Sequence, residues 1–184
     1  MPFDFAPTLR GDLLWLRPLR EDDYRGLYAI ASDPLIWELH PARDRHKEEV
    51  FRNFFREAIE GGSAFAAIDA RDGKVIGSSR YYDYDPEARD VEIGWSFLAR
   101  SQWGGAYNRQ MKRLMLEHAF QYVDSVVFLV GPQNLRSQQA VLKIGGVQEA
   151  SRRRTGTGPD GMLHHVYRIA RGAFERGPLA VYTS

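Results

Sequence analysis

The chain contains no cysteine among its 184 residues. Within the chain, this absence excludes a disulfide framework, a metal site built on thiolates and a cysteine nucleophile. It also fits a reducing compartment, and we expect a cytoplasmic protein. No apolar run approaches the ~20 residues that a membrane-spanning helix needs, and residues 1–5 show no basic segment followed by an apolar one. We therefore expect a soluble protein with no membrane partner.

An excess of charge of one sign is also lacking. The sequence has 25 Lys and Arg against 24 Asp and Glu, a formal net charge of +1. A partner held mainly by phosphate contacts, such as a nucleic acid, is therefore not expected. The short basic run at residues 152–154 is more typical of a solvated strand end. The five histidines show no metal-ligand spacing, so we expect no metal site.

The length and the hydrophobic content of 43% fit one well-buried domain. We expect a single domain over residues 1–184, with a core at about residues 10–176 and a loosely held tail at 177–184. Apolar periodicity predicts helices at residues 20–31, 47–59 and 135–144 and one that begins near residue 109. It predicts strands at residues 13–19, 63–70, 75–84, 91–98, 125–130, 147–153 and 163–169.

This order of elements predicts an α/β (α+β) fold with a mixed, mostly antiparallel central sheet and helices on both faces. The middle of the chain is an antiparallel meander, because Asp72-Gly73 suits a tight hairpin turn. After it, helices and strands alternate. A ligand is therefore expected at the carboxyl ends of the two central strands, residues 91–98 and 125–130.

The chain is organised around residues 91–120, where a strand passes through a glycine-containing loop into a helix. The first N–H groups of a helix lack internal partners, and the peptide dipoles place about half a positive charge there. Gly104 and Gly105, followed by Ala106, allow a pyrophosphate to approach the backbone. A tight connection without a ligand is the alternative. The spacing matches neither a Walker loop nor the three-glycine dinucleotide fingerprint.

The chain resembles the GCN5-related N-acetyltransferase (GNAT) family, and within it the RimJ and RimL branch of ribosomal-protein N-terminal acetyltransferases. The resemblance covers most of the chain, from the strand at residues 13–19 to Tyr167. It implies the acyl-CoA N-acyltransferase fold, with acetyl-CoA as donor and an amine as acceptor. The motifs that carry it are EIGW at 92–95, WGGAYN at 103–108, NLRS at 134–137 and KIG at 143–145.

The resemblance also implies a set of cofactor-binding residues. The pantetheine arm would bind the exposed edge of the strand at residues 95–99, and the phosphates would bind the loop before the helix. The loop fits two registers, one starting at Ser101 and one at Gln102. Near the sulfur, the family has an asparagine that matches Asn134. The residues assigned to acetyl-CoA are Trp95, Phe97, Leu98, Ala99, Gln102, Trp103, Gly104, Gly105, Ala106, Tyr107, Asn108, Arg109, Asn134 and Arg136.

Acyl transfer to an amine needs a base for the amine and an acid for the leaving thiolate. Glu92 is the candidate base, because it lies on the strand face opposite Val91 and Ile93 and the resembling family often has a glutamate there. A half-exposed strand shows the same alternation without catalysis. Ser137 is the candidate acid, since Val141 stands where many relatives have a tyrosine. Both Ser137 and Asn134 could instead cap the helix.

Aromatic residues and one histidine are expected to line the acceptor side, namely Trp37, Tyr81, Tyr82 and His164. His118 lies on the apolar stripe of the central helix and is expected in the core. Arg109, Lys112, Arg113 and Glu117 are expected to face water.

The sequence thus predicts an acetyl-CoA-dependent N-acetyltransferase that acts on the primary amine of a protein N-terminus or a small molecule. The acceptor amine is its expected partner, and a homodimer is left open. Two alternatives remain. One is a non-catalytic acyl-CoA-binding sensor or scaffold of the same fold, and the other is a nucleic-acid-associated protein that uses residues 152–154.

Overall fold

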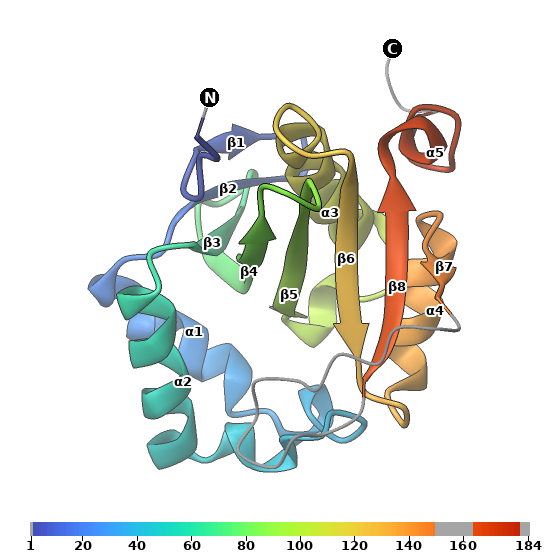
Figure 1. The fold of residues 1–184 in the computed structure, drawn as a ribbon. Coiled ribbons are helices and arrows are strands. Elements are labelled where there is room, and N and C mark those ends of the chain that lie inside the picture. The colour runs from blue at the N-terminus through green and yellow to red at the C-terminus, as the bar shows by residue number, and fades with distance from the viewer. Residues whose placement is uncertain (1, 150–163, 181–184) are drawn as a thin grey trace.

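The computed structural model describes residues 2–149 and 164–180. Its centre is one eight-stranded sheet in the order β1-β2-β3-β4-β5-β6-β8-β7 (Figure 1). All neighbouring strands are antiparallel except β5 and β6, which are parallel. This confirms the mostly antiparallel mixed sheet. The strands are β1 (Leu9–Arg10), β2 (Leu14–Pro18), β3 (Ala64–Asp69), β4 (Val75–Asp85), β5 (Asp90–Leu98), β6 (Ser125–Val130), β7 (Val147–Gln148) and β8 (His165–Ala170).

Helices α1 and α2 lie on one side of the sheet, and α3 and α4 lie on the other (Figure 1). The helices are α1 (Tyr24–Ala31), α2 (Glu48–Glu60), α3 (Ala106–Ala119), α4 (Leu135–Lys143) and the short α5 (Arg171–Glu175), with 3-10 turns η1 (Glu21–Asp23), η2 (Pro34–Ile36), η3 (Arg43–His46) and η4 (Arg100–Gln102). Among the described residues, no helix combines the length and the apolar character that a membrane crossing requires.

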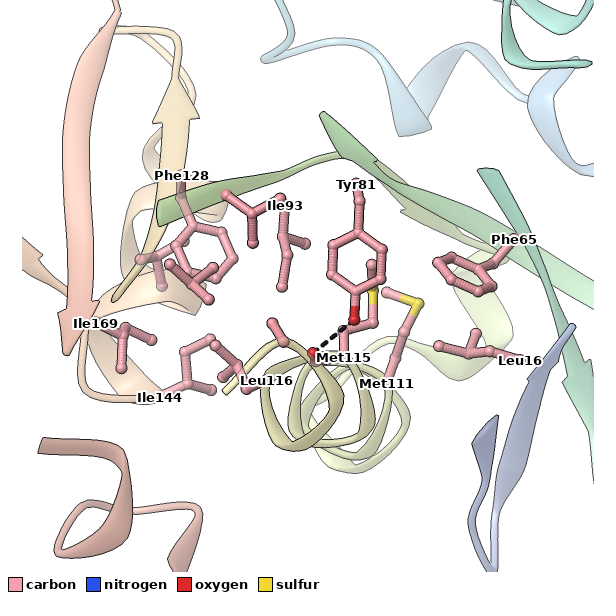
Figure 2. Packing of buried hydrophobic residues seen from close by; sticks show 14 of the residues in the cluster. Leu16, Phe65, Tyr81, Ile93, Met111, Met115, Leu116, Phe128, Ile144 and Ile169 are labelled. Atoms are coloured by element: carbon pink, nitrogen blue, oxygen red, sulfur yellow. Dashed lines mark hydrogen bonds between the residues drawn. The ribbon is translucent and has the colours of Figure 1, made fainter. Parts of the chain in front are cut away.

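The main hydrophobic core fills the space between the sheet and α3 (Figure 2). Met111, Met115 and Leu116 of α3 are fully buried there. A second core lies under α1 and α2, where Phe51, Phe54 and Phe55 pack together with Phe97 of β5. Strand β5 therefore contributes side chains to both cores, and its position relative to its neighbours is fixed from both faces.

The sheet is split between its two parallel strands. β5 pairs with β4 from Leu98 back to Asp90, but it pairs with β6 only over Asp90–Glu92. Trp95 has a φ of +52°, an uncommon value for a residue with a side chain, and it lies where the pairing with β4 shifts register. Beyond Glu92, the edge of β5 that faces β6 has no strand partner among the described residues.

Most predicted elements are confirmed, many with ends that differ by a residue or two. Helix α1 begins at Tyr24 after the 3-10 turn η1, and α3 begins at Ala106, three residues before its predicted start. Strand β7 ends at Gln148, and residues 150–153 of its predicted range lie outside the described residues. Strand β1 was not predicted, because its two residues carry no periodic pattern. Pro18 is the last residue of β2 and lies beyond the two residues of β2 that pair with β1. The N–H that proline lacks therefore costs no hydrogen bond to β1. β7 and β8 form the last hairpin, but the loop between them lies outside the described residues. The basic run at residues 152–154 lies there as well.

Candidate active site

A cavity of about 1020 Å³ opens beside the split in the sheet. Most of its lining comes from the end of β5, the loop and first turns of α3, helix α4 and the segment that contains η2 and His40. Residues 12–13 and 178–179 complete it. The cavity therefore lies at the carboxyl end of β5, where the alternation of elements predicted a ligand.

The first wall is the N-terminus of α3. Gly104 and Gly105 have φ values of +107° and +119°, and these values favour glycine over any other residue. No side chain caps the helix, and the N–H groups of Ala106, Tyr107 and Asn108 have no acceptor among the described residues. Unpaired amides and the positive end of the helix dipole together form a site for an anion.

Cationic side chains line the same cavity as these amides. Arg109, Arg113 and Lys143 line the cavity, and Asp12 is the acidic residue that lines it with them. Arg109 donates a hydrogen bond of 3.2 Å to the carbonyl of Pro178. This excess of positive charge fits a ligand with several phosphates, such as coenzyme A. Arg113, which the sequence analysis assigned to water, takes part in this wall.

Arg136 and Trp103 form a bridge across the cavity. The guanidinium of Arg136 lies 4.1 Å from the centre of the Trp103 ring. Its Nη2 donates to the carbonyl of Ile36 at 2.7 Å, so the start of α4 is tied to η2. Trp103 in turn donates its indole N–H to the carbonyl of Leu98 at 3.1 Å. Both residues were predicted to bind the cofactor, and both line the cavity.

The end of β5 supplies Ser96, Phe97 and Leu98 to the cavity. Ser96 was not singled out from the sequence, where a serine on a half-exposed strand carries no signal of its own. Behind it lies Lys112 of α3, whose amino group donates to Ser96 Oγ. The prediction that Lys112 faces water is wrong. Only 6% of its surface is exposed, because the side chain runs inward beneath β5.

The start of α4 carries the predicted acid. Ser137 lines the cavity, and its hydroxyl makes no hydrogen bond within the described part of the chain. Asn134 also lines the cavity, and its Oδ1 accepts the backbone N–H of Ser137 at 3.2 Å. Asn134 therefore caps α4, one of the two roles left open for it. Val141 is buried, and as a valine it has no hydroxyl to offer the cavity.

Glu92 lies at the vertex of the split, as the last residue of β5 that pairs with β6. It is 4% exposed and does not line the cavity. A Cβ built on Gly94 would lie 3.0 Å from Glu92 Oε1, so the carboxylate extends along the strand toward the open end. Its charge acts on Arg80, which lies on the face covered by α1 and α2. Glu92 thus lies at the split and on the face of the sheet that α1 and α2 cover.

The predicted acceptor residues do not form one wall. Trp37 lines the cavity. Tyr81 does not, and its assignment to the acceptor side is wrong: the side chain is fully buried and donates to the carbonyl of Met115 at 2.6 Å (Figure 2). Tyr82 is 39% exposed and lies edge-on to Trp95 at 5.0 Å, outside the cavity. His164 is half-buried and also lies outside it.

Three residues assigned to the cofactor have side chains that do not line the cavity, namely Trp95, Ala99 and Tyr107. Tyr107 packs against the main core and donates its hydroxyl to Asp69 Oδ2 at 3.2 Å. Ala99 N–H donates to the carbonyl of Ile76 on the β4 side at 2.8 Å. The other assigned residues of the loop line the cavity, including Gln102, Asn108 and Arg109.

The wall around Trp37 includes a histidine that was not among the predicted site residues. His40 lines the cavity, and its Nε2 lies 3.2 Å from Arg45 Nη1. Burial and the charge of Arg45 lower the pKa of His40 to about 3, so its ring is neutral at pH 7. Arg45 and Arg80 stack on the ring of Phe54 at 4.7 and 5.0 Å. Irregular segments such as this one carry no periodic signal.

Comparison with known proteins gives a family match. The model of a family described as an acetyltransferase (GNAT) domain matches residues 14–147. No curated protein sequence matches. Among solved structures, the chain is similar to a GCN5-related N-acetyltransferase from Brucella melitensis. They share 18% identity with a TM-score of 0.81, over 94% of this chain and 82% of the other.

Two similar structures contain coenzyme A. Mycobacterium smegmatis RimJ in complex with CoA-disulfide shares 20% identity with a TM-score of 0.70, over 95% of this chain and 91% of the other. Spermidine N-acetyltransferase from Vibrio cholerae, in complex with CoA and spermine, shares 18% identity with a TM-score of 0.62, over 89% of this chain and 99% of the other. At these identities the likeness establishes the fold.

Proposed function

Because the chain belongs to the GNAT acetyltransferase family, we propose that it transfers the acetyl group of acetyl-CoA to a primary amine, either a protein or peptide N-terminus or a small molecule. One observation carries the proposal. The unpaired amides at the start of α3 and the open edge of β5 border the same cavity. Such a cavity can hold a diphosphate at one end and a pantetheine arm along the other.

The walls of the cavity suit each part of coenzyme A. The amides of residues 106–108, together with Arg109, would bind the diphosphate. The unpaired edge of β5 beyond Glu92 would bind the amides of the pantetheine arm, as an added strand binds an open sheet edge. Asn134 and Ser137 would then lie on the α4 side of the arm, across from Ser96.

Acetyl transfer forms one bond, breaks another and moves two protons, and residues of this chain can assist the proton transfers. Bound acetyl-CoA would supply a thioester, whose carbonyl carbon forms the new C–N bond as its C–S bond breaks, so that the amine loses a proton and the thiolate gains one. Glu92, at the vertex of the split, would take the proton of the amine directly or through water. Ser137, whose hydroxyl lines the cavity, would donate to the thiolate.

The proposal is tested by thiol release from acetyl-CoA. We expect acetyl-CoA to raise the melting temperature of the protein, and free thiol to appear only when an amine is added. A panel of peptides, polyamines and amino acids, analysed by mass spectrometry, identifies the acceptor. Binding without turnover over the whole panel would overturn the transferase and favour a CoA-binding sensor.

Glu92→Gln tests the base. We expect kcat to fall about 10²-fold, the scale of general-base catalysis, while KM for acetyl-CoA changes little. The loss should be greatest at low pH, where the amine is protonated. Glu87→Gln, at the exposed turn between β4 and β5, is the matched control and should leave kcat unchanged. An unchanged pH–rate profile in Glu92→Gln would remove Glu92 from the mechanism.

A further inference from the structure

The amino group of Lys112 spans the split between β5 and β6. It donates to Ser96 Oγ on β5 and lies 5.6 Å from the centre of the Phe128 ring on β6. Paired residues of the two strands end at Glu92 and Val127. Phe128 is therefore the first β6 residue past the vertex, and Ser96 lies on the separated part of β5. The amino group of Lys112 therefore lies between β5 and β6 where the two strands have separated.

This surrounding offers the amino group no opposite charge. Within the described residues, no ion pair involves Lys112. β6 contains no charged residue, and strand alternation places Glu92 on the far face of β5. Tyr81 of β4 faces α3 but donates to Met115, and His118 of α3 lies against the carbonyl of Asp4 at 2.8 Å.

Burial without a counter-charge is costly. It alone lowers the pKa of Lys112 from 10.5 to about 7. An apolar side chain of similar length would fill the same space without that cost. The amino group is therefore hard to explain by packing, and its hydrogen bond to a residue of the cavity wall indicates a role in that cavity.

Ser96 connects Lys112 to the cavity. Its side chain is on the cavity wall, and its Oγ lies 2.7 Å from Ser79 Oγ and 3.4 Å from the carbonyl of Gly94. A serine oxygen that accepts from Lys112 keeps its own O–H as a donor. That donor can turn toward Ser79 or toward a ligand beside β5. Lys112 thus fixes where the serine oxygen lies and which way its proton can point.

We propose that Lys112 is a positioning residue for acyl transfer, which holds the Ser96 hydroxyl as a hydrogen-bond donor to the thioester end of bound acetyl-CoA and, when it is protonated, places a positive charge behind that hydroxyl. The inference rests on the proposed function. Negative charge develops on the carbonyl oxygen and on the sulfur during transfer, and a fixed hydrogen-bond donor stabilises it. The low polarity around Lys112 strengthens that effect.

Kinetics of five variants test the role. Lys112→Met and Ser96→Ala should each lower kcat by tenfold or more, with KM for acetyl-CoA within about twofold of wild type. The double variant should lose no more than either single one, because the two residues act as a unit. Lys112→Arg, which keeps the charge and a donor, should recover part of kcat. Lys74→Met removes an exposed lysine and should change nothing.

A second measurement does not depend on turnover. With 13C-labelled lysine, the Lys112 signal is assigned by its loss in Lys112→Met, and its titration is followed by NMR. We expect a midpoint near pH 7 in the free protein. Coenzyme A should raise this midpoint, whereas desulfo-coenzyme A, which lacks the sulfur, should not.

The outcomes separate the two proposals. If wild-type protein transfers acetyl groups but Lys112→Met keeps its kcat and pH profile, the role of Lys112 is overturned and the transferase stands. An equal response of Lys112 to coenzyme A and to desulfo-coenzyme A would also overturn it. If coenzyme A does not bind and no amine is acetylated, the proposed function fails and the role of Lys112 falls with it.

Discussion

Burying the amino group of Lys112 affects folding as well as chemistry. Burial lowers its pKa from the ordinary lysine value of 10.5 to about 7 in the folded protein. Between these values the unfolded state binds more protons, so this residue makes the free energy of unfolding rise with pH. Below pH 7 both states carry the proton, and the full cost of burial is present. Lys112 therefore destabilises the fold most below pH 7.

Lys112→Met should remove this pH dependence. We expect the variant to be more stable than wild type at pH 6.5, with the difference shrinking as the pH rises toward 10. Urea unfolding at a series of pH values measures it. Lys74→Met, at an exposed turn, should follow the wild-type curve. Parallel curves for Lys112→Met and wild type would mean that Lys112 is not buried as a cation.

Tyr81 and Tyr82 are adjacent in the sequence, but one side chain is buried and the other is exposed. The Tyr81 hydroxyl is buried and donates to Met115, whereas Tyr82 is 39% exposed. Tyr81→Phe should lower the free energy of unfolding by about 1 kcal/mol, the usual net value of a hydrogen bond. It should leave KM for acetyl-CoA and for the amine unchanged. Tyr82→Phe is the control for stability, and a changed amine KM in Tyr81→Phe would return Tyr81 to the acceptor site.

At the scale of elements, the start of α3 can be tested with a single charge. Asn108 is the third residue of the helix and lines the cavity. Asn108→Asp has almost the same shape but adds a negative charge, which favours a helix N-terminus by about 0.3–1 kcal/mol. The same charge repels a bound diphosphate. We therefore expect the free protein to become slightly more stable and the Kd for coenzyme A to rise about tenfold.

Calorimetric titration and thermal unfolding measure the two effects. Asn53→Asp, on the exposed face of α2, is the matched control and should leave the Kd unchanged. Opposite signs for stability and binding separate a phosphate site from a general loss of structure. A Kd equal to wild type would mean that the phosphates bind away from α3.

The sequence predicted the elements better than it predicted which way their side chains point. Hydrophobic periodicity located β6 to the residue and α2, α3 and α4 closely. It could not assign Tyr81, because the pairing of β4 with β5 shifts register on both sides of it. A one-residue shift exchanges the two faces of a strand. A lysine next to an apolar stripe likewise reads as exposed, so Lys112 was missed.

The part of the candidate site that is formed by backbone groups was predictable from the sequence. The predicted anion site at residues 104–108 consists of two glycines and the amides of residues 106–108, and glycines are visible in a sequence. Ser96, His40 and Arg113 join the cavity through tertiary packing, which no local pattern encodes. Sequence motifs therefore indicated the ligand, whereas the walls that orient it needed the structure.

At the scale of the whole molecule, the split makes β5 the boundary between two halves of the sheet. β1–β4 lie on one side of it, and β6, β8 and β7 lie on the other, held to β5 by only three paired residues. The bridge from Arg136 to Ile36 and Trp103 ties the halves together across the cavity. A ligand in the cavity would contact both halves and should stabilise their arrangement.

Coenzyme A should therefore stabilise the fold and protect a defined set of amides. At 100 times its Kd, a ligand that binds only the folded state adds about 2.7 kcal/mol to the free energy of unfolding. Hydrogen exchange measured with and without coenzyme A should slow most at residues 96–98 and 106–108, whose amides border the cavity. α2 lies on the other face and should respond only through global stability. A pantetheine arm bound in the split must cover the open edge of β5 and slow exchange there. Slower exchange spread evenly over the chain would therefore mean that coenzyme A stabilises the fold without occupying the split.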